Sequence, residues 1–438
     1  MKELIKKFIP KWFLGLYYFI LAFLGALIYQ FPSKKLKVIG VTGTNGKSTV
    51  VEMTSKILEE TGYKVASLSS IRFKIEKKEW PNILRMTMPG RFRLQKFLRE
   101  ATNSGCQYAV LEVTSEGIKQ YRHKFIDFDV AVFTNLSPEH IEAHGSFEKY
   151  REAKEKLFQA TKKIHVINLD DENAEYFLKF PAKEKYGYSF KIFNFQFPIF
   201  KQFSISNFQT IVAQNPQILD NGIKFSIKDI EFNLKLLGEF NIYNAMAAIC
   251  VGLSQGVDLE TCKKALEKVE RIPGRMEEVI SEPFKVIVDY AFTPNALRKV
   301  YETLLNSKFK IQNSKLICVL GAAGGGRDKW KRPVLGKLAA KYCDEIIVTN
   351  EDPYDENPYQ ILSMIKSGIL KSQLPISNFY EIIDRREAIK KSLELAKSGD
   401  VVIITGKGCE PSICIAGGKK IPWDDRKVVK EEFDKLNL

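Results

Sequence analysis

Apolar runs and amphipathic segments alternate along most of the chain. Nearly continuous apolar stretches at 35–43, 107–115 and 128–136 predict buried strands. The segments at 48–62 and 91–105 carry apolar residues at helical spacing, which predicts helices that cover a sheet. Because strands buried on both faces are typical of parallel sheets with crossover helices, the pattern predicts an α/β fold with a parallel sheet.

The alternation divides the chain into three parts. A first α/β pattern starts after an apolar N-terminal segment, continues into a β-rich stretch at about 162–237, and closes with a helix at 243–256. A linker-like stretch at 270–279 then leads into a second α/β pattern that begins at Phe284. The expected parts are an apolar N-terminal helix at 1–36, a central domain at 37–271 and a C-terminal domain at 272–438.

The N-terminal segment has the pattern of a membrane helix. From Trp12 to Ser33 there is no charged residue, and lysines stand on both sides of this run. About 20 apolar residues are enough to cross a bilayer as a helix, and aromatic residues near both ends are typical of a membrane interface. We expect an anchor that holds the downstream domains at the cytosolic face of the membrane. The alternative is a buried or interfacial helix.

The stretch VIGVTGTNGKSTV, residues 38–50, predicts a phosphate-binding loop. The strict pattern G-x-x-x-x-G-K-[ST] fails, because Val41 stands where it requires glycine. The physical arrangement remains: a β-branched strand, a turn with two glycines, and Lys-Ser-Thr at the start of a helix, where free N–H groups favour phosphate. A plain glycine turn is the alternative. The expected phosphate-binding residues are Gly43, Thr44, Asn45, Gly46, Lys47, Ser48 and Thr49.

Composition narrows the classes of ligand and compartment. The formal net charge is +15, but the lysines are scattered and no arginine–aromatic interleaving is visible, which favours phosphate-rich ligands over nucleic acid. The seven cysteines form no C-x-x-C pair and lie mostly in apolar patterns. This distribution indicates reduced thiols in a cytosolic enzyme rather than disulfides or structural zinc.

Several separated motifs resemble those of the Mur ligase family, the ATP-dependent enzymes that add amino acids to the peptide stem of peptidoglycan precursors. The motifs are GVTGTNGKST, LEVTSEG, FTNLSPEHIEAHGSFEKYREAKEKLF, LLGEFNIYNAMAA, PGRMEEV, VDYAFTPNAL, GAAGGGRDKWKRP, NEDPYDENP, GKGCE and WDDRKV. Within the family the chain most resembles the MurE-type enzymes, which add the third residue. The resemblance implies a central ATP-binding domain with a parallel sheet and a Rossmann-like C-terminal domain.

The resemblance also implies the catalytic and metal-binding residues. Glu112 ends a predicted strand, where a parallel sheet presents ligands, and its carboxylate is placed to hold magnesium beside Ser48. His140 matches a magnesium-binding histidine of the family, whereas His144 is expected to be structural. Lys154 matches a lysine that is carbamylated in the family and then serves a second magnesium ion. Lys47, Glu112, His140 and Lys154 are thus the expected catalytic set.

Further matches imply the ATP and substrate contacts. Asn244 would meet the adenine, and Arg275 and Asp289 would contact the phosphate and ribose regions. Asn241 could instead cap a helix. The expected substrate-binding residues are Thr87, Ser115 and Arg122 on the acceptor side and Arg327, Asp352, Gly406 and Glu410 on the amino-acid side.

Departures from the family leave alternatives open. Only about 36 residues precede the first strand, so we expect no N-terminal uridine-binding domain, and the acceptor could be linked to UDP or to a lipid. Tyr354 stands where diaminopimelate-adding enzymes carry an arginine, so the amino acid is diaminopimelate or lysine-like. A membrane-associated poly-γ-glutamate-type polymer synthase and a non-catalytic nucleotide-binding scaffold are the alternative functions.

Overall fold

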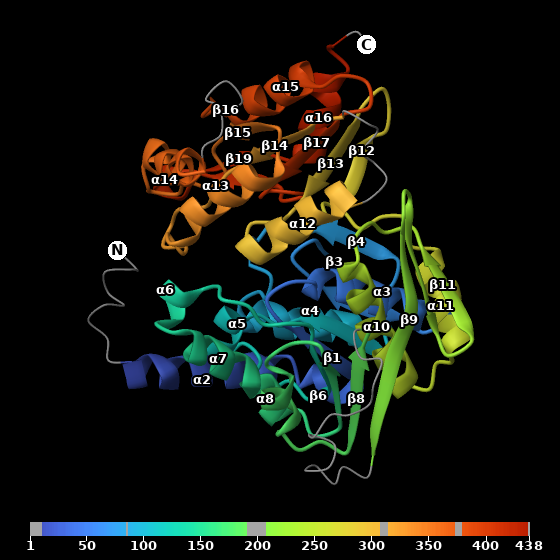
Figure 1. The fold of residues 1–438 in the computed structure, drawn as a ribbon. Coiled ribbons are helices and arrows are strands. Elements are labelled where there is room, and N and C mark those ends of the chain that lie inside the picture. Colours follow the sequence, from blue (N-terminus) through green and yellow to red (C-terminus); the bar gives the residue numbers. More distant parts are fainter. Residues whose placement is uncertain (1–10, 85, 191–206, 307–313, 373–378, 437–438) are drawn as a thin grey trace.

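Two large sheets, each covered by helices, make up the molecule. The computed structural model describes residues 11–84, 86–190, 207–306, 314–372 and 379–436. In Figure 1 the sheet of the C-terminal half stands above the sheet of the first half. We call these two halves the central and the C-terminal domain; the predicted boundary at residue 271 stays a prediction.

The central sheet has eleven strands in the order β11-β10-β9-β8-β7-β6-β1-β5-β2-β3-β4. The strands from β9 to β2 pair in parallel, as predicted, but antiparallel hairpins extend both ends. Short turns can join only antiparallel neighbours, which explains the hairpins. Its strands are β1 (Lys37–Thr42), β2 (Val65–Leu68), β3 (Arg72–Ile75), β4 (Lys78–Pro81), β5 (Tyr108–Glu112), β6 (Phe128–Phe133), β7 (Ile164–Asn168), β8 (Glu184–Ser189), β9 (Phe208–Leu219), β10 (Gly222–Ile227) and β11 (Ile230–Leu234). Part of the predicted β-rich stretch, 191–206, lies outside the described residues.

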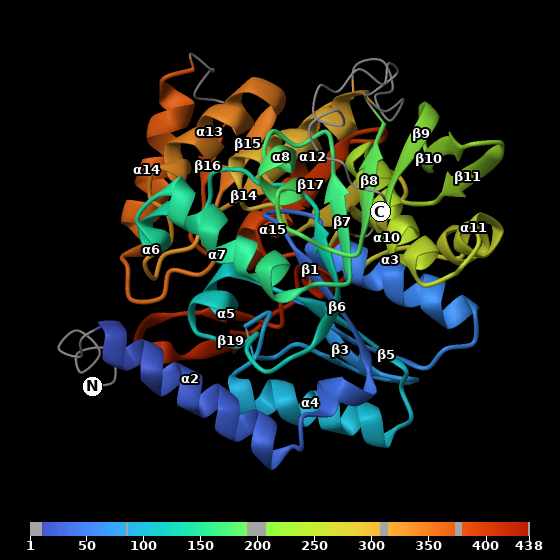
Figure 2. The same cartoon turned by 90° about the horizontal axis from the view of Figure 1, so that it is seen from below.

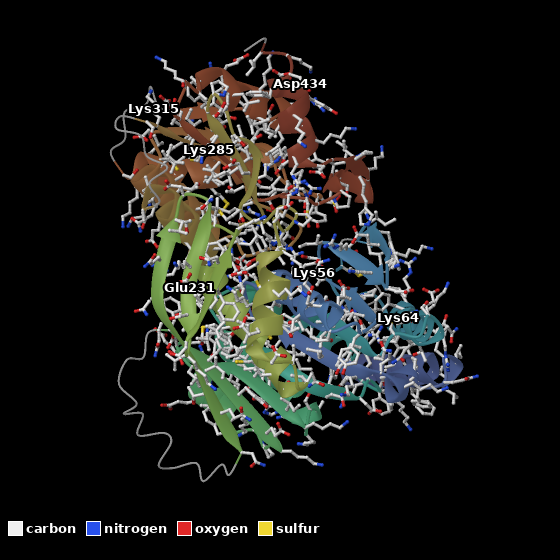
Figure 3. All side chains as sticks on the ribbon, turned by 90° about the vertical axis from the view of Figure 1, so that its right-hand side faces the viewer. Lys56, Lys64, Glu231, Lys285, Lys315 and Asp434 are labelled. Atoms are coloured by element: carbon white, nitrogen blue, oxygen red, sulfur yellow. The ribbon has the colours of Figure 1, made fainter. Side chains whose placement is uncertain are left out.

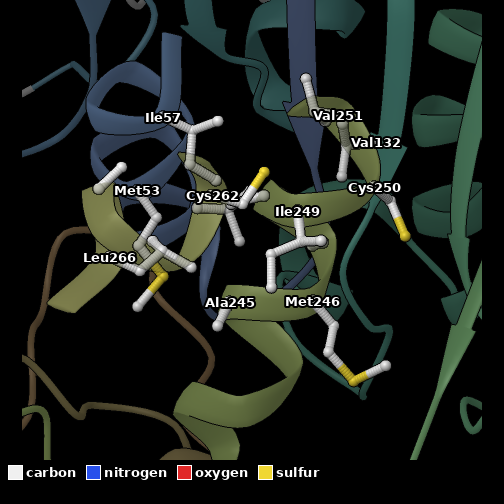
Figure 4. Close-up of a cluster of buried hydrophobic side chains, with 14 of the residues drawn as sticks. Met53, Ile57, Val132, Ala245, Met246, Ile249, Cys250, Val251, Cys262 and Leu266 are labelled. Carbon is white, nitrogen blue, oxygen red and sulfur yellow. The ribbon is translucent and has the colours of Figure 1, made fainter. Parts of the chain in front are cut away.

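Helices cover both faces of this sheet. One face packs against α3 (Lys47–Glu60), α10 (Phe240–Ser254) and α11 (Leu259–Glu267), whose buried side chains meet Val132 of β6 (Figure 4). The other face packs against α4 (Arg91–Asn103), α7 (Phe147–Ala160) and α8 (Ala174–Leu178). The short helices α5 (Ser115–Lys119) and α6 (Ile141–His144) follow β5 and β6 and stand near the C-terminal domain.

The C-terminal sheet has six strands in the order β12-β13-β17-β14-β15-β16, with only β12 antiparallel to its neighbour. The predicted linker at 270–279 is wrong in its last residues, because Glu277–Ile280 forms β12 and pairs with β13. The strands are β12 (Glu277–Ile280), β13 (Lys285–Asp289), β14 (Leu316–Leu320), β15 (Glu345–Val348), β16 (Phe379–Glu381) and β17 (Val401–Thr405); the helices are α12 (Pro294–Asn306), α13 (Lys331–Tyr342), α14 (Pro358–Leu370), α15 (Arg385–Leu395) and α16 (Asp425–Phe433). Figure 3 shows this domain from the side, with Lys285, Lys315 and Asp434 on its surface.

The predicted N-terminal helix exists as α2 (Lys11–Ile28), but it lies along the central domain. It packs beside α4, and its Ala22 and Ala26 are buried there. The helices α2 and α4 lie together at the edge of the molecule in Figure 2. Phe19 and Phe23 meet the ring of Phe125 edge-on at centroid distances of 5.1 and 5.4 Å. Among the described residues no helix is long and apolar enough to cross a membrane.

Candidate functional site

A cavity of about 690 Å³ between the two domains contains the predicted site. All of the predicted site residues line it except Gly406. Gly406 lies just behind the wall, where an added Cβ would come within 2.7 Å of Oε2 of the lining residue Glu351. Segments that are far apart in the sequence therefore meet in one place.

The phosphate-binding loop joins β1 to α3 in a conformation that needs both of its glycines. Gly43 and Gly46 have φ values of 148° and 83°. A Cβ at Gly43 would lie 1.9 Å from Thr134 Oγ1, and one at Gly46 would lie 2.3 Å from Asn244 Oδ1. Both glycines line the cavity, while the N–H groups of Thr44 and Asn45 donate to Asn135. A phosphate cradle would therefore use the N–H groups at the start of α3.

Lys47, Ser48 and Glu112 meet at the end of this loop. The Lys47 ammonium donates to the carbonyl of Thr44 (2.8 Å) and stands 3.7 Å from Glu112 Oε1. The Ser48 hydroxyl donates to Glu112 Oε2 at 2.7 Å, and the backbone N–H of Ser70 donates to the same oxygen at 3.0 Å. Burial lowers the pKa of Lys47, while Glu112 opposes that shift. The hydroxyl and carboxylate oxygens form a donor set that suits a hard cation such as magnesium.

The side chains of Lys154 and His140 flank this group. The buried Lys154 amine donates to the carbonyl of Gly43 at 2.7 Å and lies over the ring of Tyr150. Burial, together with the charge of Lys47, holds the pKa of Lys154 well below its usual range. Burial lowers the pKa of His140 to about 2, so its imidazole stays neutral. Within the described residues there is no cluster of three or more His, Cys, Asp or Glu side chains that could hold a metal ion.

His144, which is expected to be structural, contacts the start of α5. Its Nε2 lies 3.2 Å from Ser115 Oγ and 3.3 Å from Glu116 Oε1, at the start of α5. Burial lowers its pKa to about 4. It therefore contacts the residues that carry the predicted acceptor-binding serine.

The predicted ATP contacts come from α10 and from the start of the C-terminal domain. The Asn244 side chain donates to Asn241 Oδ1, and Asn241 in turn donates to the carbonyl of Leu237, so Asn241 does not cap α10. Arg275 reaches Ser70 Oγ at 3.1 Å. The Asp289 carboxylate accepts the N–H groups of Met276 and Ala291 and has its pKa raised by burial.

On the amino-acid side, two of the predicted carboxylates share one buried lysine. The Lys407 ammonium contacts both Asp352 oxygens, at 3.0 and 3.1 Å, and also Glu410 Oε2. The Tyr290 hydroxyl donates to Glu410 Oε1 at 2.9 Å. Arg327 lines the same end of the cavity, and the neighbouring Tyr354 and Tyr290 raise its pKa against the effect of burial.

Sequence reasoning missed several contacts that join the two domains. Glu139 pairs with Lys331, and the carboxylate of Asp328 accepts the N–H groups of Ile141 and Glu142 at the start of α6. Ser70, which bridges Ser48 and Arg275, was also missed. Glu139 and Lys331 lie inside the quoted motifs SPEH and RDKWKRP, which is the signal that could have found them.

Comparisons with known proteins agree with this architecture. Residues 41–252 match the family model of the Mur ligase middle domain, and residues 274–408 match that of the Mur ligase glutamate ligase domain. A relative from Caldanaerobacter subterraneus subsp. tengcongensis, named UDP-N-acetylmuramoyl-L-alanyl-D-glutamate–2,6-diaminopimelate ligase, is 38% identical over 92% of this chain and 79% of its own length. A relative with the same name from Aquifex aeolicus is 38% identical over 93% and 80%.

Solved structures extend the likeness. A structure of a UDP-N-acetylmuramoyl-L-alanyl-D-glutamate–2,6-diaminopimelate ligase superposes with a TM-score of 0.60 at 31% identity, covering 92% of this chain and 79% of that one. A folylpolyglutamate synthase from Mycobacterium tuberculosis gives a TM-score of 0.67 at 16% identity, over 89% and 92%, and so shows a shared fold alone. The matched domains and relatives show that the chain belongs to the Mur ligase family, with similar relatives of the MurE type.

Proposed function

We propose that this chain adds diaminopimelate or a lysine-like amino acid to a muramoyl-dipeptide peptidoglycan precursor. Membership of the family makes it an ATP-dependent ligase that forms amide bonds. One observation carries the substrate assignment: the phosphate loop, the acceptor-side residues and the Arg327–Glu410 end of the cavity all face a single space. The names of the relatives support the same reaction.

The reaction needs the acceptor carboxylate to be activated, because a carboxylate is a poor electrophile. Its oxygen attacks the γ-phosphorus of ATP, which releases ADP and leaves an acyl phosphate. The amine of the incoming amino acid then attacks the acyl carbon, and inorganic phosphate leaves through a tetrahedral intermediate. Lys47 and the N–H groups of the loop neutralise charge on the transferring phosphate, and the rest of the site positions the two reactants.

Ser48, Glu112 and His140 would hold a magnesium ion, which supplies charge neutralisation at the phosphates when bound. Lys154 would serve a second ion as its carbamate, formed when the neutral amine attacks carbon dioxide and loses a proton. The low pKa of Lys154 supports this modification, since only the uncharged amine is a nucleophile.

The experiment that tests the function is phosphate release by the purified full-length protein. The reactions contain ATP, a UDP-muramoyl dipeptide and one amino acid at a time, with Lys47→Ala as the inactive control. We expect release with diaminopimelate or lysine and at least about a 100-fold loss in the variant, because the loop loses its point charge. Release that needs no dipeptide acceptor, or that continues with glutamate over many additions, would favour the polymer synthase.

The exposed face of α2 supports a further part of the proposal: this enzyme works in the cytoplasm, seated on the inner membrane surface. Of the eighteen exposed large apolar side chains in the described residues, nine belong to this helix: Phe13, Leu16, Tyr17, Phe19, Ile20, Phe23, Leu24, Leu27 and Ile28. Because its other face packs on α4, α2 would lie in the plane of the interface, as amphipathic membrane helices do. The exposed Lys34 and Lys35 follow a few residues after the end of α2, which suits anionic headgroups.

Vesicle sedimentation of the full-length protein tests this seat. We expect binding to phosphatidylglycerol vesicles, weakened by salt, and its loss when Ile20 and Leu24 are both changed to Glu. Leu370→Glu is the control, because Leu370 is an exposed apolar residue on α14, away from α2. If the wild-type protein stays in the supernatant, or forms dimers through α2, the proposed membrane contact is wrong. Neither result would bear on the ligase reaction.

A further inference from the structure

Two arginines, Arg91 and Arg122, converge between α2 and the edge of the cavity. Both bind the same residue: Arg91 Nη2 donates to the backbone carbonyl of Gln120, and Arg122 Nη2 donates to Gln120 Oε1 at 2.8 Å. Arg122 Nη1 also donates to the carbonyl of Met88. In the part of the chain that the structure describes, neither guanidinium forms an ion pair. Two positive charges thus stand together with only neutral acceptors.

The pair also has unused hydrogen-bonding capacity. The Nε atom of each arginine is buried and has no acceptor among the described residues. Arg122 Nη2 additionally meets Met86 Sδ at 3.6 Å, and a thioether is a weak acceptor. Burial lowers the pKa of both arginines, and Arg91 lowers that of Arg122 further, while Glu116 opposes this. Buried donors without partners are costly, so the pair is suited to an anionic ligand.

Its position links the helix to the acceptor side of the site. Arg122, Gln120 and Met86 line the cavity next to Thr87 and Ser115, the predicted acceptor contacts. On the opposite side the Arg91 guanidinium lies 4.2 Å from the centre of the Tyr18 ring on α2. Gly15 of α2 also faces the Tyr121 ring, where an added Cβ would lie 3.7 Å away, an ordinary van der Waals distance. The helix therefore forms the outer wall of the arginine pair.

We propose that Arg91, together with Arg122, binds the phosphate-bearing end of the acceptor, and that Tyr18 of α2 positions Arg91 for this. The inference rests on the proposed function, which supplies a muramoyl-peptide acceptor. Guanidinium groups present forked donors that match phosphate oxygens, and a doubly positive site suits a phosphate or diphosphate better than a single carboxylate. The diphosphate could come from a nucleotide or from a lipid carrier, and both share this chemistry.

The test compares three acceptors: a UDP-muramoyl dipeptide, a polyprenyl-diphosphate-linked muramoyl dipeptide in micelles, and a muramoyl dipeptide without phosphate. For Arg91→Gln we expect KM to rise about 10- to 100-fold for the phosphate-bearing acceptors, as for loss of a charged hydrogen bond. In Arg91→Gln three quantities should stay unchanged: kcat, the KM for ATP and the KM for the phosphate-free acceptor. Arg93→Gln, an exposed arginine on the same helix, is the matched control. The two phosphate-bearing arms identify the carrier.

Positioning by Tyr18 has its own readout. Tyr18→Phe keeps the ring and should leave KM for the phosphate-bearing acceptors unchanged. Tyr18→Leu removes the ring and should raise this KM, as Arg91→Gln does. An equal rise in KM for the phosphate-free acceptor would assign Arg91 to a peptide carboxylate and overturn the proposal. So would unchanged KM values with a lowered melting temperature, which would make the arginine structural.

A direct binding measurement distinguishes failure of the arginine site from failure of the proposed ligase function. Calorimetric titration of the full-length protein with the UDP-muramoyl dipeptide needs no turnover. Binding that is weakened by Arg91→Gln in a protein without ligase activity would support the arginine site and reject the proposed function. Binding of equal affinity in wild type and Arg91→Gln would overturn the site.

Discussion

Glu139 and Lys331 form a buried ion pair that joins the central domain to the C-terminal domain. Their Oε1 and Nζ atoms are 2.8 Å apart, and each side chain is 3% exposed. Burial raises the pKa of Glu139, and the charge of Lys331 is the largest effect that opposes this shift. The pair stands beside His140 and so couples the position of the C-terminal domain to the predicted metal-binding residues.

Removal of one partner should cost much more than removal of both. Lys331→Met leaves the Glu139 carboxylate buried without compensation, so we expect a loss of about 3–5 kcal/mol in the free energy of unfolding by urea. Adding Glu139→Gln should restore most of it. Lys315→Met, in the more exposed pair with Glu345, should cost less than about 1 kcal/mol. Similar losses in the single and double variants would show that the pair does not act as a unit.

Tyr354 should control which diamino acid is used. It lines the cavity beside Arg327, at the position where the resembled diaminopimelate enzymes carry arginine. Tyr354→Arg would supply a guanidinium group that can pair with the distal carboxylate of the amino acid. The backbone φ at this position is 52°, so arginine would be strained there just as tyrosine is. We expect the ratio of kcat/KM for diaminopimelate to that for lysine to rise at least about 10-fold.

The control for this change is Tyr359→Arg, at an exposed position on the nearby helix α14. It adds the same charge at the surface of the same domain and should leave the ratio unchanged. An unaltered ratio in Tyr354→Arg would place the distal end of the amino acid elsewhere in the cavity.

Glu351 should make stability fall as the pH rises toward 7. Burial, and then the neighbouring Asp352, raise its pKa from the ordinary 4.5 to about 7. Its Oε2 has no hydrogen-bond partner among the described residues, as fits a protonated acid. The folded protein binds this proton more tightly than the unfolded chain, so the stabilisation is complete below pH 4.5 and is lost as the pH rises through about 7.

Glu351→Gln removes this titration. At about 1.4 kcal/mol for each unit of pKa, wild type should lose about 3 kcal/mol relative to the variant between pH 4 and pH 8. Urea unfolding of both proteins across that range gives the difference. A constant difference between them would show that folding leaves the pKa of Glu351 at its ordinary value.

Much of the fold followed from the sequence because its signals are local. The strands β1, β5 and β6 are buried on both faces, so their apolar runs are continuous. The hairpin of β3 and β4 was missed because β4 is short and mostly exposed, so its residues are polar. The apolar run of α2 predicted a helix, but no pattern in the run showed that its alanines would pack on α4.

The candidate site divides in the same way. The loop from Gly43 to Thr49 is a contiguous motif whose geometry its own residues determine. The ion pair of Glu139 and Lys331 joins residues 192 positions apart, and the Arg91–Arg122 pair depends on where α5 ends relative to α4. Such contacts arise from packing between domains and helices, which periodicity alone does not describe.

Lys154 should act as a carboxylate and not as a cation. Its amine is buried and hydrogen-bonded to the carbonyl of Gly43, and burial together with the charge of Lys47 holds its pKa well below its usual range. A neutral amine can add to carbon dioxide, and the resulting carbamate would bring a negative charge to the side of the loop that holds Lys47. Lys154→Ala should therefore lose nearly all ligase activity and regain part of it with added formate, acetate or propionate.

Lys156→Ala, two residues along the same helix and exposed, should stay active. Carbon-13 NMR of the wild type with labelled bicarbonate should show one carbamate signal that is missing in Lys154→Ala. Rescue by short amines instead of carboxylates, with no such signal in an active sample, would mean that the positive charge of Lys154 is what the reaction uses.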